Sequence, residues 1–384
     1  MTTRLTQRDI ARLAKVSQTT VSLVLNNRTA ASARIPAETR DRVLKVIRET
    51  GYVADPLARR LLQQRNQIFG VFTYEPVFPS ASADFYHPFL NGIEESAEEL
   101  GCDLLLFTSA PVTDGRRLVF HDNNRLRIAD GSLLLGRRIP AEELSRLVAE
   151  KYPFVSVGRR DDPDLPEADN PAGRRGDGPR RARATVPYVG ADYVTATATV
   201  TARAFALGHE RVAFVGPGEG AESSADRLRG FRQIAPRGLH LGPVDPSRQS
   251  SAASGAEDVG GADDGRAAPA LGGREPTDVL AELLGQGVTA VFVEDLADAA
   301  SLAEAATARG LTVPDDLSLV ALGDASRPVA GDAEYSGFHI PRKEMGRQAV
   351  GLLEAILSGE ERETQQLLSC ELVEGSTLAA PKGL

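Results

Sequence analysis

Polar side chains gather on one face of an expected helix near the N-terminus, at Gln18, Thr19, Ser22 and Asn26. Amide and hydroxyl groups of this kind form hydrogen bonds with base edges in the major groove of DNA, and an apolar neighbour such as Leu23 suits a thymine methyl. The chemistry expected of this face is therefore non-covalent recognition of a base sequence.

A first helix is expected to begin at Thr6, whose hydroxyl accepts a hydrogen bond from the backbone N–H of Asp9. The Asp9 carboxylate reaches back to the start of the helix, and this reciprocal pair is a common helix-starting arrangement. Ile10, Leu13 and Ala14 then fall on one apolar face, and the helix is expected to end near Ala14.

A second helix, beginning after the N-cap Ser17, is expected to carry the polar face. Its apolar residues Val21, Val24 and Leu25 have i, i+3, i+4 spacing and are expected to pack on the first helix. A third amphipathic helix, from about 36 to 50, completes a three-helix head. The alternative is a structural hairpin of helices inside an ordinary bundle, which would show the same apolar spacing.

Charge separates the N-terminal segment from the rest of the chain. Residues 1–65 contain 13 Lys and Arg against 5 Asp and Glu, a net charge of +8, whereas the whole chain of 384 residues carries −9. Basic charge confined to one end is expected where that end neutralises phosphates, so it favours DNA binding over the structural hairpin.

Composition excludes several other classes of protein. The chain has 42% hydrophobic residues, enough for substantial cores, but no run of 18 apolar residues and no apolar signal-peptide region near its start. We therefore expect a cytoplasmic protein without a membrane segment. Cys102 and Cys370 are far apart and indicate no disulfide framework, and the five His show no metal-ligand spacing. No metal and no other cofactor is expected.

A short helix is expected between the head and the rest of the chain. Asp55 suits the N-cap and Pro56 the first helical position, but barely two turns follow. A helix so short is marginal in water, so we expect it to form only when a partner copy and DNA hold it. The predicted organisation is a head over 1–54, a hinge helix and linker over 55–66, and a body over 67–384.

Strand-like and helical patterns alternate through the body. The expected strands are 68–73, 103–108, 131–135, 153–158, 211–215, 290–293 and 318–322, and the expected helices are 89–100, 194–206, 277–284 and 296–309. Such alternation predicts two α/β lobes with parallel, doubly wound sheets, and a ligand site between the lobes beyond the carboxyl ends of the strands. Segments 161–187 and 236–276 are expected to be flexible loops.

Together the head and the two-lobed body resemble the LacI/GalR (lactose-repressor) family of bacterial transcription factors over nearly the whole chain. The head residues that match the family's pattern are Thr6, Asp9, Ile10, Ala11, Ala14, Val16, Ser17, Thr20, Val21, Ser22, Val24, Leu25 and Asn26. The resemblance implies that the second helix enters the major groove, where Gln18, Thr19 and Leu23 read bases. It also places Thr6 among the DNA contacts, and it places four further residues near phosphates: Ser17, Thr20, Ser22 and Asn26.

The same resemblance makes 58–62 a hinge helix, in which Ala58 and Leu61 contact the operator and Leu61 wedges into its minor groove. The head departs from the family at Lys15, where glycine is usual, and at Leu23, where arginine is often found. A short insertion over 29–34 is a further departure. Leu23 is expected to shift the reading away from guanine.

The body is similar to periplasmic sugar-binding proteins, which implies a small effector between the lobes, a sugar or a sugar derivative. The implied effector contacts are Phe85, Arg159, Asp192, Ser223, Arg227, Asp295 and Asp324. Arg227 matches the family's effector-binding arginine, and its fork suits adjacent hydroxyls or a carboxylate. Glu294 stands where the family commonly has Asn, and Gly323 where it often has Asp.

Structural roles are the alternative for several of these residues. Arg227 has the character of a surface helix cation, and Phe85 that of a core residue. Asp295 and Asp324 suit helix caps, since Asp is favoured there for backbone reasons alone.

The function predicted from the sequence is that of a homodimeric, cytoplasmic transcription regulator, a repressor, which binds a pseudo-palindromic operator and responds to the effector. A solute-binding protein of a sugar transport system is the alternative, and the basic head opposes it. An enzyme on a doubly wound fold is a third hypothesis. The segment 216–220 lacks GxGxxG spacing and no G-x-S-x-G elbow is present, so no enzymatic activity is expected.

Overall fold

The structure, a computed structural model, divides into two compact units that are described separately, Met1–Asn66 and Gln67–Leu384. The described residues are 5–25, 35–50, 52, 65–75, 83–113, 116–121, 124–162, 185–242, 270–326, 329 and 333–382. The predicted hinge helix, with Ala58 and Leu61, lies outside them, as do Asn26 and the greater part of the two predicted loops.

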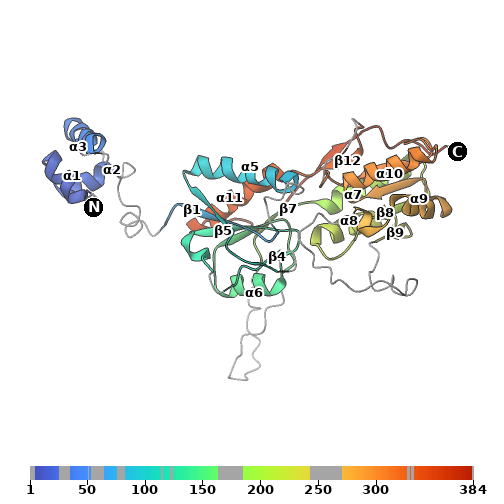
Figure 1. The fold of residues 1–384 in the computed structure, drawn as a ribbon, viewed down its shortest axis with the longest axis horizontal. Coiled ribbons are helices and arrows are strands. Elements are labelled where there is room, and N and C mark those ends of the chain that lie inside the picture. Colours follow the sequence, from blue (N-terminus) through green and yellow to red (C-terminus); the bar gives the residue numbers. More distant parts are fainter. Residues whose placement is uncertain are drawn as a thin grey trace, which may run out of the picture. The chain divides into compact units, whose positions relative to one another are not determined.

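The described part of the N-terminal unit contains three helices around a small apolar core: α1 (Gln7–Ala14), α2 (Gln18–Leu25) and α3 (Ala37–Thr50) (Figure 1). The core consists of Ile10, Ala11, Ala14, Val21, Val24 and Val43. The predicted capping pair of Thr6 and Asp9 is confirmed. Leu13 is 50% exposed, so its expected place on the buried face is wrong. Ala11 takes that place, because its small side chain lets α1 lie close to its neighbours.

The turn between α1 and α2 holds Lys15 in the left-handed region, with φ +54° and ψ +47°. The Lys15 N–H donates to the Arg12 carbonyl at 3.3 Å, and Arg42 of α3 donates from Nε to the Ala14 carbonyl at 3.0 Å. Glycine adopts this backbone conformation without the Cβ strain that lysine carries. The glycine usual in the resembled family therefore has a physical reason, and Lys15 occupies its place at a cost.

Lys15→Gly is expected to stabilise the head by about 0.5–1 kcal/mol, because the strain it removes exceeds the entropy that glycine adds to the unfolded chain. Amide hydrogen exchange at Ile10 and Val21 in the full chain should then slow. Lys45→Gly in the middle of α3 is the control, and there exchange should accelerate, since glycine costs about 1 kcal/mol inside a helix. Faster exchange in the Lys15 variant would contradict the strain.

The body consists of two lobes, each built on a six-stranded sheet. The strand order of the first sheet, all parallel, is β13 (Gln365–Leu368), β7 (Tyr188–Ala191), β6 (Phe154–Val157), β5 (Gly131–Leu135), β1 (Ile68–Thr73), β2 (Asp103–Phe107). The order of the second is β14 (Glu371–Val373), β12 (Ser336–His339), β11 (Ser318–Ala321), β10 (Ala290–Val293), β8 (Val212–Val215), β9 (Leu239–Leu241). Only the β12–β14 pair of this sheet is antiparallel within the described residues. A short antiparallel pair joins β3 (Val112–Thr113) to β4 (Arg116–Arg117).

Helices cover both faces of each sheet (Figure 1). The first sheet has α5 (Ala83–Leu100) and α11 (Arg342–Ser358) on one face and α6 (Ala141–Ala149) on the other. The second has α7 (Tyr193–Ala206) and α8 (Glu222–Ile234) on one face and α9 (Pro276–Gly285) and α10 (Leu296–Ala308) on the other. Two 3-10 turns are Leu126–Ile128 and Ala270–Gly273. Alternate strand residues serve opposite faces, so the predicted doubly wound lobes are confirmed.

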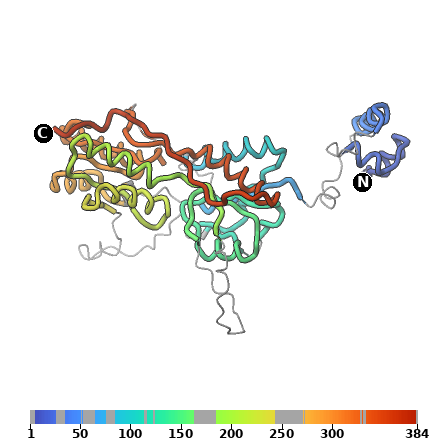
Figure 2. The backbone as a smooth tube through the Cα atoms, turned by 180° about the vertical axis from the view of Figure 1, so that it is seen from behind, coloured from blue at the N-terminus to red at the C-terminus, as the bar shows by residue number. Residues whose placement is uncertain are grey.

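Three described connections join the lobes. They are Asp192 between β7 and α7, residues 340–341 between β12 and α11, and residues 369–370 between β13 and β14. Figure 2 shows the connection into α7 beside the C-terminal ones, and the Asp192 N–H donates to the Leu368 carbonyl at 2.8 Å. Side chains at these crossings therefore lie near both lobes.

Two sequence expectations were wrong in the body. The segment 236–276 contains β9, whose Leu239–Leu241 pairs with β8, because an edge strand needs only a few apolar residues to complete the sheet. Helix α5 begins at Ala83 rather than near Phe89 and includes Pro88. Buried Tyr86 and Phe89 anchor it on both sides of the proline.

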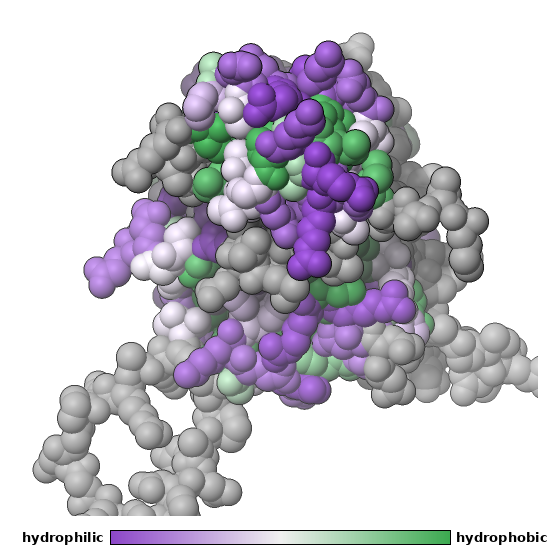
Figure 3. All heavy atoms as spheres, turned by 90° about the vertical axis from the view of Figure 1, so that its left-hand side faces the viewer, coloured by the Kyte–Doolittle hydropathy of each residue, from purple (hydrophilic) through white to green (hydrophobic). Residues whose placement is uncertain are grey.

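Figure 3 shows one face of the molecule on which hydrophilic side chains predominate and apolar ones form scattered patches. Among the described residues, no helix is both long and apolar enough to cross a membrane. Cys102 and Cys370 are each partly buried, and neither forms a disulfide.

Candidate nucleic-acid interface and interlobe site

The α2 face predicted to read bases is open to solvent in the N-terminal unit. Ser17, Gln18 and Thr19 are exposed, whereas Val21 is completely buried on the opposite side. Ser17 Oγ accepts from the Thr20 N–H at 3.1 Å, which confirms its predicted place as the N-cap. The buried side of α2 thus fixes which side chains point outward.

Helix α1 orients the first long side chain of this face. Arg8 Nε donates to Gln18 Oε1 at 3.4 Å, and Gln18 Nε2 donates to Gln7 Oε1 at 3.5 Å. These contacts hold the Gln18 amide at the edge of the two helices. Ser22 and Leu23 are partly buried on α2, and their DNA contacts stay predictions.

The Thr6 hydroxyl is engaged in the helix cap. It donates to the Asp9 carboxylate at 2.7 Å, and the hydrogen bonds from Thr6 are the main reason that the pKa of Asp9 is lowered from its ordinary value. A DNA contact from Thr6 stays a prediction as well, and the cap is its observed role.

Arg227 lies buried at the carboxyl ends of the second sheet and is only 5% exposed, which excludes the surface-cation alternative. Its Nε donates to the Leu322 carbonyl at 2.6 Å and its Nη1 to the Ser223 carbonyl at 3.0 Å. The guanidinium carbon lies 3.9 Å from the ring centroid of Tyr193. Two backbone carbonyls and an aromatic face therefore hold this cation in place.

Gly323 has a backbone conformation that disfavours the aspartate that the resembled family often has there. Its φ is +145°, and a Cβ would lie 3.1 Å from Arg227 Nη2 and 3.0 Å from Ile340 Cδ1. The next residue, Asp324, is engaged with the end of β12: it pairs with His339 Nδ1 at 2.6 Å and accepts from the Ile340 N–H at 3.2 Å. The carboxylate at this corner thus belongs to Asp324, one residue after the family's usual position, and it is bonded to the end of β12.

Asp192 and Asp295 cap helices. Asp192 accepts from the Thr195 N–H at 3.0 Å at the start of α7. Asp295 accepts from the Ala297 N–H at 2.8 Å at the start of α10, and also from the Ser326 N–H at 3.2 Å. The cap is the observed role of both carboxylates, and effector contact stays a prediction.

Two arginines after β6 link the lobes. Arg159 donates to both carboxylate oxygens of Asp226 on α8, at 2.5 and 3.0 Å, and to Asp161 at 2.6 Å. Burial opposes the charge on Arg159, but its hydrogen bonds with these carboxylates raise its pKa above the ordinary value. Arg160 bonds Glu222 on α8 at 2.9 Å. Arg159 therefore uses its fork within the protein, in a link between the lobes that the sequence did not predict.

Phe85, on α5 of the first lobe, is flanked by two arginines that were not among the predicted site residues. The guanidinium carbon of Arg137, after β5, is 4.7 Å from the Phe85 ring centroid, and that of Arg342, at the start of α11, is 4.9 Å away. The Nη2 atom of Arg342 is 3.8 Å from Asp324 of the second lobe. Each arginine follows the end of a strand by two or three residues, and this position in the sequence could have indicated both as site residues.

Three of the charged residues predicted for the effector site, Arg227, Asp295 and Asp324, lie around Arg342, whereas Arg159 is paired with Asp226 and Asp192 caps α7. Burial lowers the pKa of Arg342, while the neighbouring Asp324 opposes this shift, and Arg227 and Asp295 also act on Arg342 electrostatically. Phe85 joins the same corner through its ring contact with Arg342. The structure thus gathers these side chains where strands of the second sheet end, as expected for a ligand site in such folds. The described residues contain no group of His, Cys, Asp and Glu arranged to hold a metal ion.

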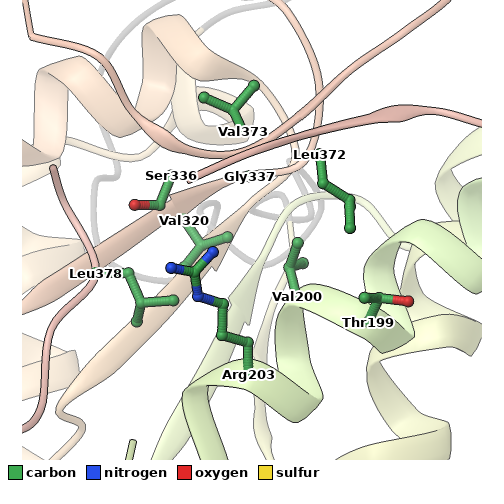
Figure 4. Close-up of a pocket in the computed structure, with 9 residues that line it drawn as sticks. All are labelled: Thr199, Val200, Arg203, Val320, Ser336, Gly337, Leu372, Val373 and Leu378. Atoms are coloured by element: carbon green, nitrogen blue, oxygen red, sulfur yellow. The ribbon is translucent and has the colours of Figure 1, made fainter. Parts of the chain in front are cut away.

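A small cavity of about 30 Å³ lies elsewhere in the second lobe (Figure 4). Its lining includes Thr199, Val200 and Arg203 of α7 and, from the second sheet, Ser336 and Leu372. Its volume holds roughly two water molecules. This cavity is too small for a sugar and is separate from the corner around Arg342.

Two parts of the chain match known families. Residues 6–55 match the bacterial regulatory proteins of the lacI family, and residues 202–378 match a periplasmic binding protein-like domain. The chain belongs to the LacI family of transcriptional regulators. The predicted helix-turn-helix head, DNA-binding class and two-lobed body of this LacI-family regulator are confirmed.

Relatives of this LacI-family regulator are similar along most of its length. It is 27% identical to the HTH-type transcriptional repressor CytR of Escherichia coli (strain K12), over 99% of the chain and 98% of that protein. It is 30% identical to the sucrose operon repressor of Klebsiella pneumoniae, over 63% of the chain and 64% of that protein. Its fold matches the crystal structure of the lac repressor dimer bound to operator and the anti-inducer ONPF with a TM-score of 0.67. The match has 19% sequence identity and covers 98% of this chain and 100% of that one. These relatives are named as repressors, not as enzymes.

Proposed function

We propose that this LacI-family regulator is a repressor that binds a pseudo-palindromic operator as a homodimer and is controlled by a sugar or sugar derivative held between its lobes. The exposed polar face of α2, on a head segment of net charge +8, is the observation that carries the proposal. The similarity to CytR and to the sucrose operon repressor supports repression.

The proposed organisation follows from this role. Residues 1–54 form the DNA-binding head, 55–66 the hinge helix and linker, and 67–384 the effector-binding and dimerisation body. A regulator that acts on operator DNA works in the cytoplasm, associated with the nucleoid. The effector must favour one arrangement of the body by about 1–3 kcal/mol to change operator affinity usefully.

The effector contacts proposed for the body centre on Arg227 and Phe85. Asp295 and Asp324 each keep a partly exposed carboxylate at the same corner of the second lobe. A solute-binding protein would use such a corner equally well, but the basic helix-turn-helix head would then have no role. Enzymatic activity is not proposed.

The proposal is tested by selecting genomic fragments that bind the purified full chain and repeating the binding with a panel of sugars. We expect one palindromic sequence to be enriched, and one class of sugar to release or tighten it. Affinity should fall steeply with salt, because the head releases counterions from the phosphates. Failure to enrich any sequence, with weak and salt-insensitive binding, would reject the DNA-binding proposal.

Gln18→Ala is expected to weaken binding to the selected operator by about 1–3 kcal/mol, a factor of roughly 5 to 150, and to relax the preference at one base pair in each half-site. Gln286→Ala, at the exposed end of α9, is the matched control and should leave affinity unchanged. The measurement is a titration of labelled operator variants. Equal affinities for the two variant proteins would remove Gln18 from the base-reading positions.

A further inference from the structure

Arg342 is a buried cation whose side chain has no hydrogen-bonded partner among the described residues. Its side chain is 7% exposed, and its Nε has no hydrogen-bond partner. The nearest carboxylate oxygen, on Asp324, is 3.8 Å from Nη2, which is beyond hydrogen-bond distance. Its guanidinium carbon also lies 4.9 Å from the centroid of the Phe85 ring. A buried charged group whose donors are not hydrogen-bonded is costly, so such a group in a native protein calls for a partner.

A second guanidinium and a helix end lie at the same place. Arg137 is partly buried, and the contact that the structure shows for its guanidinium is the same Phe85 ring. Helix α11 has 17 residues and begins at Arg342, and its N-cap, Pro341, supplies no side-chain hydrogen bond to the first turn. Unsatisfied N–H groups and the helix dipole make such an end favourable for an anion.

The carboxylates around this corner are already engaged by other donors. Glu75 accepts from the Arg137 N–H at 3.2 Å and from the Tyr86 hydroxyl. Asp324 is held by the end of β12, and Asp295 caps α10. These groups moderate the local charge, but none of them meets the Arg342 donors at hydrogen-bond distance.

We propose that the effector of this regulator carries an anionic group, a carboxylate or a phosphate, and that Arg342, assisted by Arg137 and the start of α11, binds it. The proposal rests on the proposed effector-controlled function. An arginine fork presents paired donors and no acceptor, which matches two oxygens of one anionic group. A neutral hydroxyl would satisfy single donors but would add no negative charge beside the buried cation, whose nearest carboxylate, on Asp324, lies beyond hydrogen-bond distance. Phe85 then contributes an apolar wall beside the anion.

Inorganic phosphate and acetate are the probes for this subsite. The melting temperature of the full chain is measured without DNA, in phosphate, acetate or chloride at one ionic strength. We expect phosphate or acetate to raise it by about 2 °C or more over chloride. R342Q should lose that rise, whereas R232Q, an exposed arginine on α8, should keep it. Comparison of these two variants removes any contribution from phosphate bound to the basic head.

The two probes distinguish the source of the anion. A rise in phosphate alone indicates a phosphorylated effector, and a rise in acetate indicates a carboxylate. No rise in either, or an equal rise in R342Q, overturns the proposal. R137Q is a second variant, expected to halve the rise or more, in case R342Q does not fold. Operator selection is independent of this measurement, so a regulator that enriches its operator but ignores both anions would lose this proposal alone.

Discussion

Asp226→Ala is expected to lower the free energy of unfolding of the body by about 3–5 kcal/mol, which is the usual cost of removing one partner of a buried ion pair. The Asp226 side chain is 3% exposed and the Arg159 side chain 15%. Both oxygens of the carboxylate accept hydrogen bonds from Arg159, so the variant would leave that guanidinium buried, with Asp161 as its remaining carboxylate partner among the described residues. Denaturant unfolding of the full chain, followed by circular dichroism, measures the loss in the body transition.

Arg229→Ala provides a matched control at the same carboxylate. Arg229 contacts Asp226 at 3.2 Å, but its side chain is 58% exposed, so its removal should cost less than about 1 kcal/mol. Removing Arg159 and Asp226 together should restore part of the stability, because no unpaired buried charge remains. Equal losses of unfolding free energy in the Asp226 and Arg229 variants would show that the buried Arg159–Asp226 pair stabilises the body no more than the exposed Arg229 contact does.

The Arg159 pair also bears on how the effector acts. Arg159 follows β6 of the first lobe and Asp226 belongs to α8 of the second, so this pair joins the lobes through side chains of the protein itself. An effector changes a two-state equilibrium only by its differential affinity for the two states. Its contacts must therefore add to, or compete with, a link that the protein already makes by itself.

The sequence predicted those parts of the fold that depend on local patterns. Strands β1, β5 and β10 have the predicted bounds, because each is a short, mainly apolar segment that is buried on both faces of its sheet. The Thr6 cap and the Ser17 cap were also predicted, since capping depends on residues within one turn. The departure at Lys15 was visible in the sequence, and the structure adds its left-handed backbone.

The candidate site was predicted less well, because its partners are distant in the sequence. Arg159 and Asp226 are 67 residues apart, and only the arrangement of the two lobes brings them together. Arg342 was missed because β12, which precedes it, has the sequence Ser-Gly-Phe-His and lacks an apolar run. Asp192 and Asp295 are a different case. Their position after a strand suited both a ligand and a cap; the structure shows the cap, and effector contact stays a prediction.

Gly92→Ala is expected to force α5 and α11 apart and to lower the free energy of unfolding by about 1–3 kcal/mol, as overpacking does. A Cβ on Gly92 would lie 1.9 Å from the backbone carbonyl oxygen of Lys343, and one on Gly346 would lie 2.2 Å from that of Phe89. Backbone atoms cannot rotate away as a side chain does. The two helices therefore approach each other through this pair of glycines.

The same substitution should affect the anion site, because α5 carries Phe85 and α11 begins at Arg342. Separation of the helices near Lys343 would move Arg342 away from the ring, so Gly92→Ala should lose the phosphate- or acetate-dependent rise in melting temperature. Gly351→Ala on α11 is the control: its Cβ would lie 3.8 Å from the Arg362 side chain, and alanine favours the helix by about 0.5–1 kcal/mol. That variant should be at least as stable as the natural chain and keep the anion response. A Gly92 variant that matched it in both measurements would show that the glycine contact does not position Arg342.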